Sequence, residues 1–181
     1  SADDEIRKLK KEAEDILRKA REDRERLKEK NRKIDEDMRR TLKKLHEETR
    51  ELEKKVRREK GEDERVKELL DDLRRKDDDM RKRVTELHEE NKKIDDEVRR
   101  EVERLEEEIR DTIRKLDEDV KRDGVTEELV KEIRELLRRL EEKIEELRRR
   151  YEKKLEELKR KVDELIRRYK RKLERVAEEV K

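Results

Sequence analysis

The sequence predicts an all-α protein: an untwisted, antiparallel three-helix bundle built from long, straight helices. Charged residues make up 66% of the chain, apolar residues only 27%, and proline is absent. This composition is typical of long helices or coiled coils. The apolar residues recur with a helical period, which argues against the disorder that so much charge would otherwise favour. The only two glycines, Gly61 and Gly124, divide the chain into thirds.

The first helix is predicted over residues 2–60. Ser1 is a favourable capping residue, and acidic side chains follow it in the first turn, whereas basic side chains fill the last turn before Gly61. Both features compensate the helix macrodipole. Its apolar stripe includes Ile6 and Leu42, with Arg24 midway between them.

The second helix is predicted over residues 63–122. Gly61 suits the left-handed conformation that often follows a helix C-terminus, and Asp63 suits the N-cap of the next helix. Its apolar stripe has an 18-residue repeat, which is marked by Val66, Val84, Val102 and Val120.

The third helix is predicted over residues 126–180, after Gly124 and with Thr126 as the N-cap. Successive apolar residues of its stripe are separated by 4, 3, 4, 3 and 4 positions, and this series repeats. The spacing matches that of a straight α-helix, so the helix has no reason to supercoil. At 1.5 Å per residue, each helix should be about 80 to 90 Å long. The stripe consists of Ile133, Leu137, Leu140, Ile144, Leu147, Tyr151, Leu155, Leu158, Val162, Leu165, Tyr169, Leu173, Val176 and Val180.

The loops around both glycines are short, so consecutive helices should run antiparallel. Residues 1–181 are therefore expected to form a single three-helix bundle. The middle third carries net negative charge and the two outer thirds net positive charge. This complementarity favours packing of the middle helix against both neighbours, although each exposed ion pair contributes little.

Asn31 and Asn91 occupy stripe positions where the pattern calls for Leu or Ile. Each lies thirty residues from Gly61, so an antiparallel hairpin brings both to the same level. A buried amide is unfavourable alone but tolerated when paired, and a polar layer can fix helix register. We predict that Asn31 and Asn91 form a central structural polar layer. The alternative is that both side chains turn out to solvent.

Other polar residues also lie in or beside the stripes. His46 and Asp77 are at nearly equal distances from Gly61, and so are Asp35 and His88. These are candidate hydrogen-bond pairs at the boundary of the core. Further candidates are Thr41, Thr49, Thr85 and Thr112.

Arg24 is expected at the level of Tyr151 of the third helix. Its aliphatic stem could pack in the stripe while its guanidinium group reaches the rim or lies over the aromatic ring.

Sites for chemistry are not expected. His46 and His88 should lie roughly 18 Å apart along the hairpin, too far to share one metal ion. The sequence has no cysteine, no Gly-rich phosphate loop and no Ser/His/Asp set. We therefore expect no enzyme activity, no catalytic residue, no cofactor and no metal.

The 61 basic and 59 acidic side chains are interleaved, so no field of one sign is available for nucleic acid or an anionic membrane. No apolar run approaches the roughly 20 residues that span a bilayer. We expect a soluble protein, cytoplasmic when expressed, that binds neither nucleic acid nor membrane.

The 18-residue repetition, the glycine-only loops and the Glu, Lys and Arg surface resemble de novo designed, parametrically generated helical bundles with buried polar residues. Ser1, with no Met before it, is what a cleaved purification tag would leave. The resemblance implies a thermostable structural scaffold without a natural biochemical function, monomeric and without partners. The alternative is an interaction module that self-associates as a homo-oligomer or accepts a further helix in an open groove.

Overall fold

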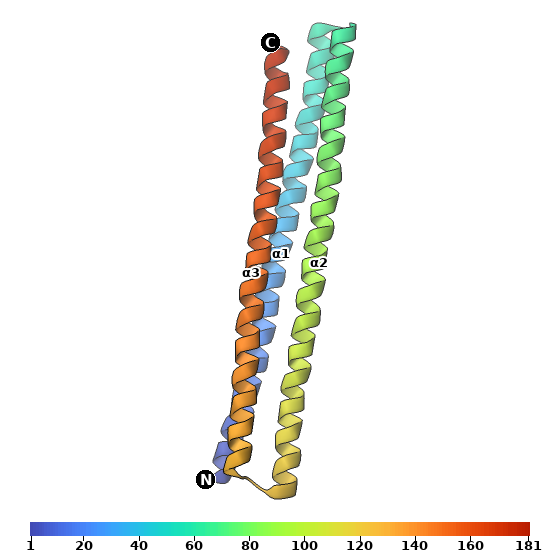
Figure 1. Ribbon diagram of the computed structural model, residues 1–181. Helices are drawn as coiled ribbons and strands as arrows, with labels where there is room; N and C mark the ends of the chain where they lie inside the picture. Colours follow the sequence, from blue (N-terminus) through green and yellow to red (C-terminus); the bar gives the residue numbers. More distant parts are fainter. The chain divides into compact units, whose positions relative to one another are not determined.

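The computed structural model describes residues 1–181 and contains three long helices and no strand. They are α1 (Ala2–Lys60), α2 (Glu64–Asp123) and α3 (Glu127–Glu179), in chain order from blue to red (Figure 1). The predicted all-α, three-helix fold is confirmed. Each helix boundary lies within one residue of its predicted position.

All three helices begin at a capping side chain. In each case a side-chain oxygen of the residue before the helix accepts a hydrogen bond from a main-chain N–H of the first turn, which would otherwise lack a partner. The acceptor and donor residues are Ser1 and Asp4 (3.3 Å), Asp63 and Val66 (2.9 Å), and Thr126 and Leu129 (3.1 Å). The capping residues predicted from the sequence are confirmed.

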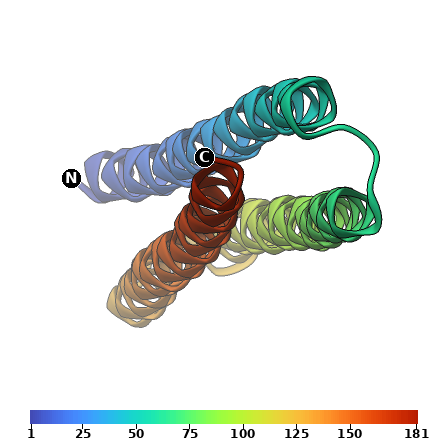
Figure 2. The same ribbon diagram turned by 90° about the horizontal axis from the view of Figure 1, so that it is seen from above.

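Both glycines adopt the left-handed backbone conformation, with φ of 77° at Gly61 and 74° at Gly124. The N–H of Gly61 donates to the carbonyl oxygen of Arg57, and that of Gly124 donates to Val120. Each glycine therefore completes the last turn of a helix and redirects the chain. Figure 2 shows the loop that follows Gly61 and joins α1 to α2.

The chain forms two compact units. The first unit comprises residues 1–30 and 94–154, and the second comprises residues 31–93 and 155–181. Each unit contains one segment of every helix. In the first unit the three segments contact one another through ion pairs: Lys10 with Asp117 (2.6 Å), Lys19 with Glu145 (3.8 Å), and Lys143 with Glu108 (3.0 Å). Polar contacts described below link the three segments of the second unit in the same way.

The core of each unit follows the apolar stripes. All predicted stripe residues of α3 are buried except Leu165, which is half-buried, and no large apolar side chain is exposed. The expected stripe of α1 needs correction. Ile6, Arg24 and Leu42 are only half-buried, and the fully buried residue beside Arg24 is Asp23. The buried face of α1 is therefore rotated away from Ile6, Arg24 and Leu42, the residues from which it was predicted.

Candidate functional site: polar contacts between the helices

Asn31 and Asn91 face each other in the second unit, and their exposed fractions are only 6% and 5%. The side-chain nitrogen of Asn31 donates to the main-chain carbonyl oxygen of Asn91 at 3.0 Å, and Asn91 donates to Asn31 in the same way at 3.0 Å. A helical carbonyl oxygen has a second lone pair, so it can accept this additional hydrogen bond. The two buried amides thus form a reciprocal pair that links α1 to α2.

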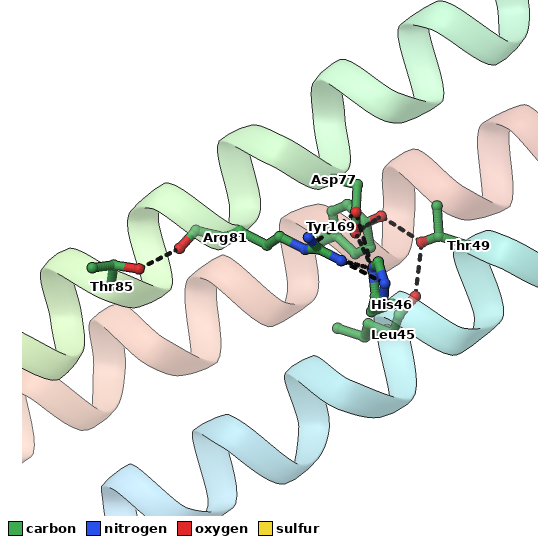
Figure 3. A network of polar contacts seen from close by, with 7 residues as sticks. All are labelled: Leu45, His46, Thr49, Asp77, Arg81, Thr85 and Tyr169. Atoms are coloured by element: carbon green, nitrogen blue, oxygen red, sulfur yellow. Dashed lines mark hydrogen bonds and ion pairs between the residues drawn. The ribbon is translucent and has the colours of Figure 1, made fainter.

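His46 and Asp77 form a second contact between α1 and α2. The Nδ1 atom of His46 lies 3.0 Å from Oδ2 of Asp77, and Asp77 is 7% exposed. On the same helix as Asp77, Arg81 places its Nε atom 3.4 Å from Oδ2 of Asp77. A guanidinium nitrogen of Arg81 also contacts both ring nitrogens of His46 (Figure 3). The Asp77 carboxylate therefore has a cation and an imidazole as neighbours.

Tyr169 brings α3 into this cluster. Its hydroxyl oxygen lies 2.5 Å from Oγ1 of Thr49 and 3.3 Å from Oδ1 of Asp77 (Figure 3). Oγ1 of Thr49 also lies 2.7 Å from the carbonyl oxygen of Leu45. Two hydroxyl protons serve three contacts, so two arrangements are consistent: Tyr169 donates to Thr49 and Thr49 to Leu45, or Thr49 donates to Tyr169 and Tyr169 to Asp77. The second arrangement connects all three helices directly, whereas in the first arrangement α2 joins the cluster through the contact of Asp77 with His46.

Burial raises the pKa of the Tyr169 hydroxyl well above its usual value. The negative charge of Asp77 adds to this shift, whereas the hydrogen bond with Thr49 opposes it. The sequence offered Thr49 as a candidate but placed Tyr169 only in the apolar stripe. The available signal was that a tyrosine hydroxyl buried in a core needs a hydrogen-bond partner.

His88 and Asp35 repeat the arrangement with the helices exchanged. Nδ1 of His88 on α2 lies 2.7 Å from Oδ1 of Asp35 on α1, and Nε of Arg39 lies 3.2 Å from Oδ2 of Asp35. In both clusters an aspartate and an arginine four residues later on one helix meet a histidine of the other. The side chains of His46 and His88 are 22% and 32% exposed, so both pairs lie at the boundary of the core.

Two of the threonine candidates form hydrogen bonds within their own helix rather than between helices. The hydroxyl groups of Thr85 and Thr112 donate to the carbonyl oxygens of Arg81 and Glu108, four residues earlier in the same helix. A threonine inside a helix often satisfies its hydroxyl group in this way.

Asp23, which is buried, and Arg148, which is half-buried, are neighbouring charged residues of the first unit that the sequence prediction missed. Asp23 is 4% exposed, and burial raises the pKa of its carboxyl group, an effect that the positive charge of Arg148 opposes. A signal was available on α3. Val130, Arg148 and Ile166 follow one another at the interval of the 18-residue repeat, so Arg148 stands where the neighbouring repeats have an apolar residue.

Tyr151 does have cations over its ring, but neither is Arg24. The Arg150 guanidinium carbon lies 5.0 Å and the Lys154 Nζ 5.2 Å from the ring centroid. The Tyr151 hydroxyl group donates to Oε2 of Glu97 at 3.4 Å. Burial raises the pKa of this hydroxyl to about 12, and nearby carboxylates add to the shift.

No group of three or more His, Asp or Glu side chains is arranged to hold a metal ion. None of the three helices has a segment both long and apolar enough to cross a membrane. In comparisons with known proteins, no protein-family model, curated protein or solved structure matches this chain.

Proposed function

We propose that this chain is a structural scaffold of designed origin, in which buried polar pairs select one arrangement of three regular helices. The reciprocal pair of Asn31 and Asn91 is the observation that carries this proposal. Two amides buried inside an apolar stripe weaken the core relative to Leu or Ile. Their presence therefore calls for a purpose that Leu or Ile could not serve.

That purpose is to distinguish one helix pairing from its near equivalents. A stripe with a constant 18-residue repeat looks almost the same after a shift of one repeat. After such a shift of α2 along α1, Asn31 would face the position of Leu73 or Ile109, which lie one repeat before and one repeat after Asn91. The amide would then be buried without a partner, at a cost of about 1 to 3 kcal/mol.

The loop that contains Gly61 already restrains α1 against α2 within one chain. The amide pair should therefore act most strongly against staggered pairing between two copies of the chain, where no loop sets the register. The proposed scaffold is monomeric for this reason.

A double-mutant cycle tests the proposal. Asn31→Leu alone should lower the free energy of unfolding by about 1 to 3 kcal/mol, because it leaves the Asn91 amide buried without its partner. The double change of Asn31 and Asn91 to Leu should recover this loss and can exceed the wild-type stability, since an apolar layer replaces two desolvated amides. Denaturant unfolding measures all four proteins. A coupling energy near zero between the two positions would refute a role for the pair.

An interaction module that accepts a further helix was the alternative prediction. An open groove of this kind needs exposed apolar side chains to cover. Every large apolar side chain is at least half-buried, which supports the self-contained scaffold over the groove.

A further inference from the structure

Two buried side-chain atoms in the protein have no hydrogen-bond partner: Oδ2 of Asp23 and Nε of Arg148. Both belong to the first unit, one on α1 and the other on α3. The ion pair between Lys19 and Glu145 lies one turn before each of them, so the two atoms occupy nearly the same level of the seam between these helices. Among the charged groups around Asp23, Arg148 has the strongest influence on its carboxyl group.

The two atoms have complementary chemistry but do not form a direct ion pair. Oδ2 of Asp23 can only accept a hydrogen bond when ionised, whereas the Nε–H of Arg148 can only donate one. Another nitrogen of Arg148, Nη2, donates to Glu145 on its own helix, which holds the guanidinium group beside α3. One acceptor and one donor are thus left facing the same seam.

We propose that Asp23 and Arg148 together bind one water molecule in the seam between α1 and α3. The water would donate to Oδ2 of Asp23 and accept from Nε–H of Arg148. Internal water molecules commonly occupy such positions, bonded to buried polar groups that have no other partner. A small anion would be repelled by Asp23 and a cation by Arg148, so a neutral molecule that both donates and accepts suits the site.

The local sequence favours the room that such a molecule needs. The core residue one turn before Asp23 is Ala20, which is 1% exposed and has the smallest side chain that a core position of this helix carries.

A crystal structure of the full chain, at a resolution that shows ordered solvent, tests the site directly. We expect one solvent peak within hydrogen-bonding distance of both Oδ2 of Asp23 and Nε of Arg148. The peak should persist in Asp23→Asn, because the amide oxygen still accepts, and should be lost in Asp23→Leu. Direct contact between the two side chains without solvent, or no peak at all, would overturn the proposal.

A measurement in solution covers the case in which a variant does not crystallise. A nuclear Overhauser effect from water to the Nε–H proton of Arg148, separated from chemical exchange by its opposite sign in the rotating frame, should be observed in the wild-type chain and lost in Asp23→Leu. Asp37→Leu, at an exposed position of α1, is the matched control and should leave the signal unchanged. Absence of the signal from the wild-type chain, or its persistence in Asp23→Leu, would contradict a bound water. Neither outcome bears on the pairing of Asn31 with Asn91.

Discussion

Asp23 places a carboxylate in the core of the first unit, where burial raises its pKa above the value of about 3.9 that it has in an unfolded chain. The folded state then binds the Asp23 proton more tightly than the unfolded state does. The contribution of this group to the free energy of unfolding therefore falls as the pH rises from about 4 through its folded pKa, and the whole penalty is present above that pKa.

Replacing Asp23 with Leu should remove this penalty. We expect the free energy of unfolding at pH 7 to rise by on the order of 1 kcal/mol, because an apolar side chain replaces a desolvated charge. Arg148 is only half-buried and keeps its ion pair with Glu145, so it is not left as an uncompensated buried charge. The gain over wild type should shrink as the pH is lowered through the carboxyl range. Denaturant unfolding at several pH values measures both effects, with Asp37→Leu as the exposed control. An equal gain at every pH, or a loss at pH 7, would mean that Asp23 is adequately solvated.

The two tyrosines provide a second test of burial at the residue scale. Burial raises the pKa of Tyr151 to about 12 and shifts that of Tyr169 in the same direction. The chain has no tryptophan, so the absorbance of tyrosinate reports these two residues alone. In the folded protein this signal should develop near pH 12 or above, whereas the chain in denaturant should titrate near pH 10.

The same shifts predict alkaline destabilisation. Above about pH 10 the tyrosines of the unfolded chain lose protons that the folded state retains, so the free energy of unfolding falls as the pH rises. Tyr169→Phe should reduce this dependence, and circular dichroism at rising pH measures it. A folded protein in which both tyrosines ionise near pH 10 would show that their hydroxyl groups are not buried.

At the scale of the elements, the glycine positions set where helices end. An added Cβ would meet no atom within 4 Å at either Gly61 or Gly124, but both residues have positive φ. Gly→Ala at either position should therefore lower stability by about 1 to 2 kcal/mol through backbone strain alone. Gly→Asn should be tolerated better, because Asn adopts the left-handed conformation more readily. Equal stability of the Ala, Asn and wild-type proteins in denaturant would contradict this role of the glycines.

The helix boundaries were predictable because each is marked by local chemistry: a glycine at the end and an oxygen-bearing side chain at the start. The inward face of α1 was harder to predict. Asp23 and Arg24 lie about 100° apart around the helix. Apolar residues are sparse in this part of α1, so the period alone does not decide which of the two is buried.

The residues of each polar pair could be matched because both lie at nearly the same number of residues from Gly61. In an antiparallel hairpin such residues lie opposite each other. The structure brings together Asn31 with Asn91, His46 with Asp77, and His88 with Asp35. The atoms that form each contact could not be predicted from these distances. Side-chain conformations depend on local packing, so the sequence could not indicate that each amide nitrogen reaches a main-chain carbonyl oxygen. The contact of Tyr169 with Thr49 depends on the placement of α3, which has no such hairpin relation to α1.

At the scale of the whole molecule, the charge pattern agrees with the pairing of the helices. The ion pairs between α1 and α2 in the first unit join a base of α1 to an acid of α2: Lys10 to Asp117 and Arg21 to Glu106. The basic partner of each pair is exposed to solvent, so each pair contributes only tenths of a kcal/mol. Charge complementarity thus supports the arrangement, while the buried polar pairs are better suited to select it.

Whether this chain is a self-contained scaffold is tested most directly by its molar mass in solution, measured by light scattering over a range of concentrations. We expect the wild-type chain to give 22.7 kDa at every concentration. The variant with both Asn31 and Asn91 changed to Leu should include larger species, because its uninterrupted apolar stripes permit staggered pairing between copies. A wild-type mass of two or three times 22.7 kDa would contradict the monomeric scaffold and favour the self-assembling module.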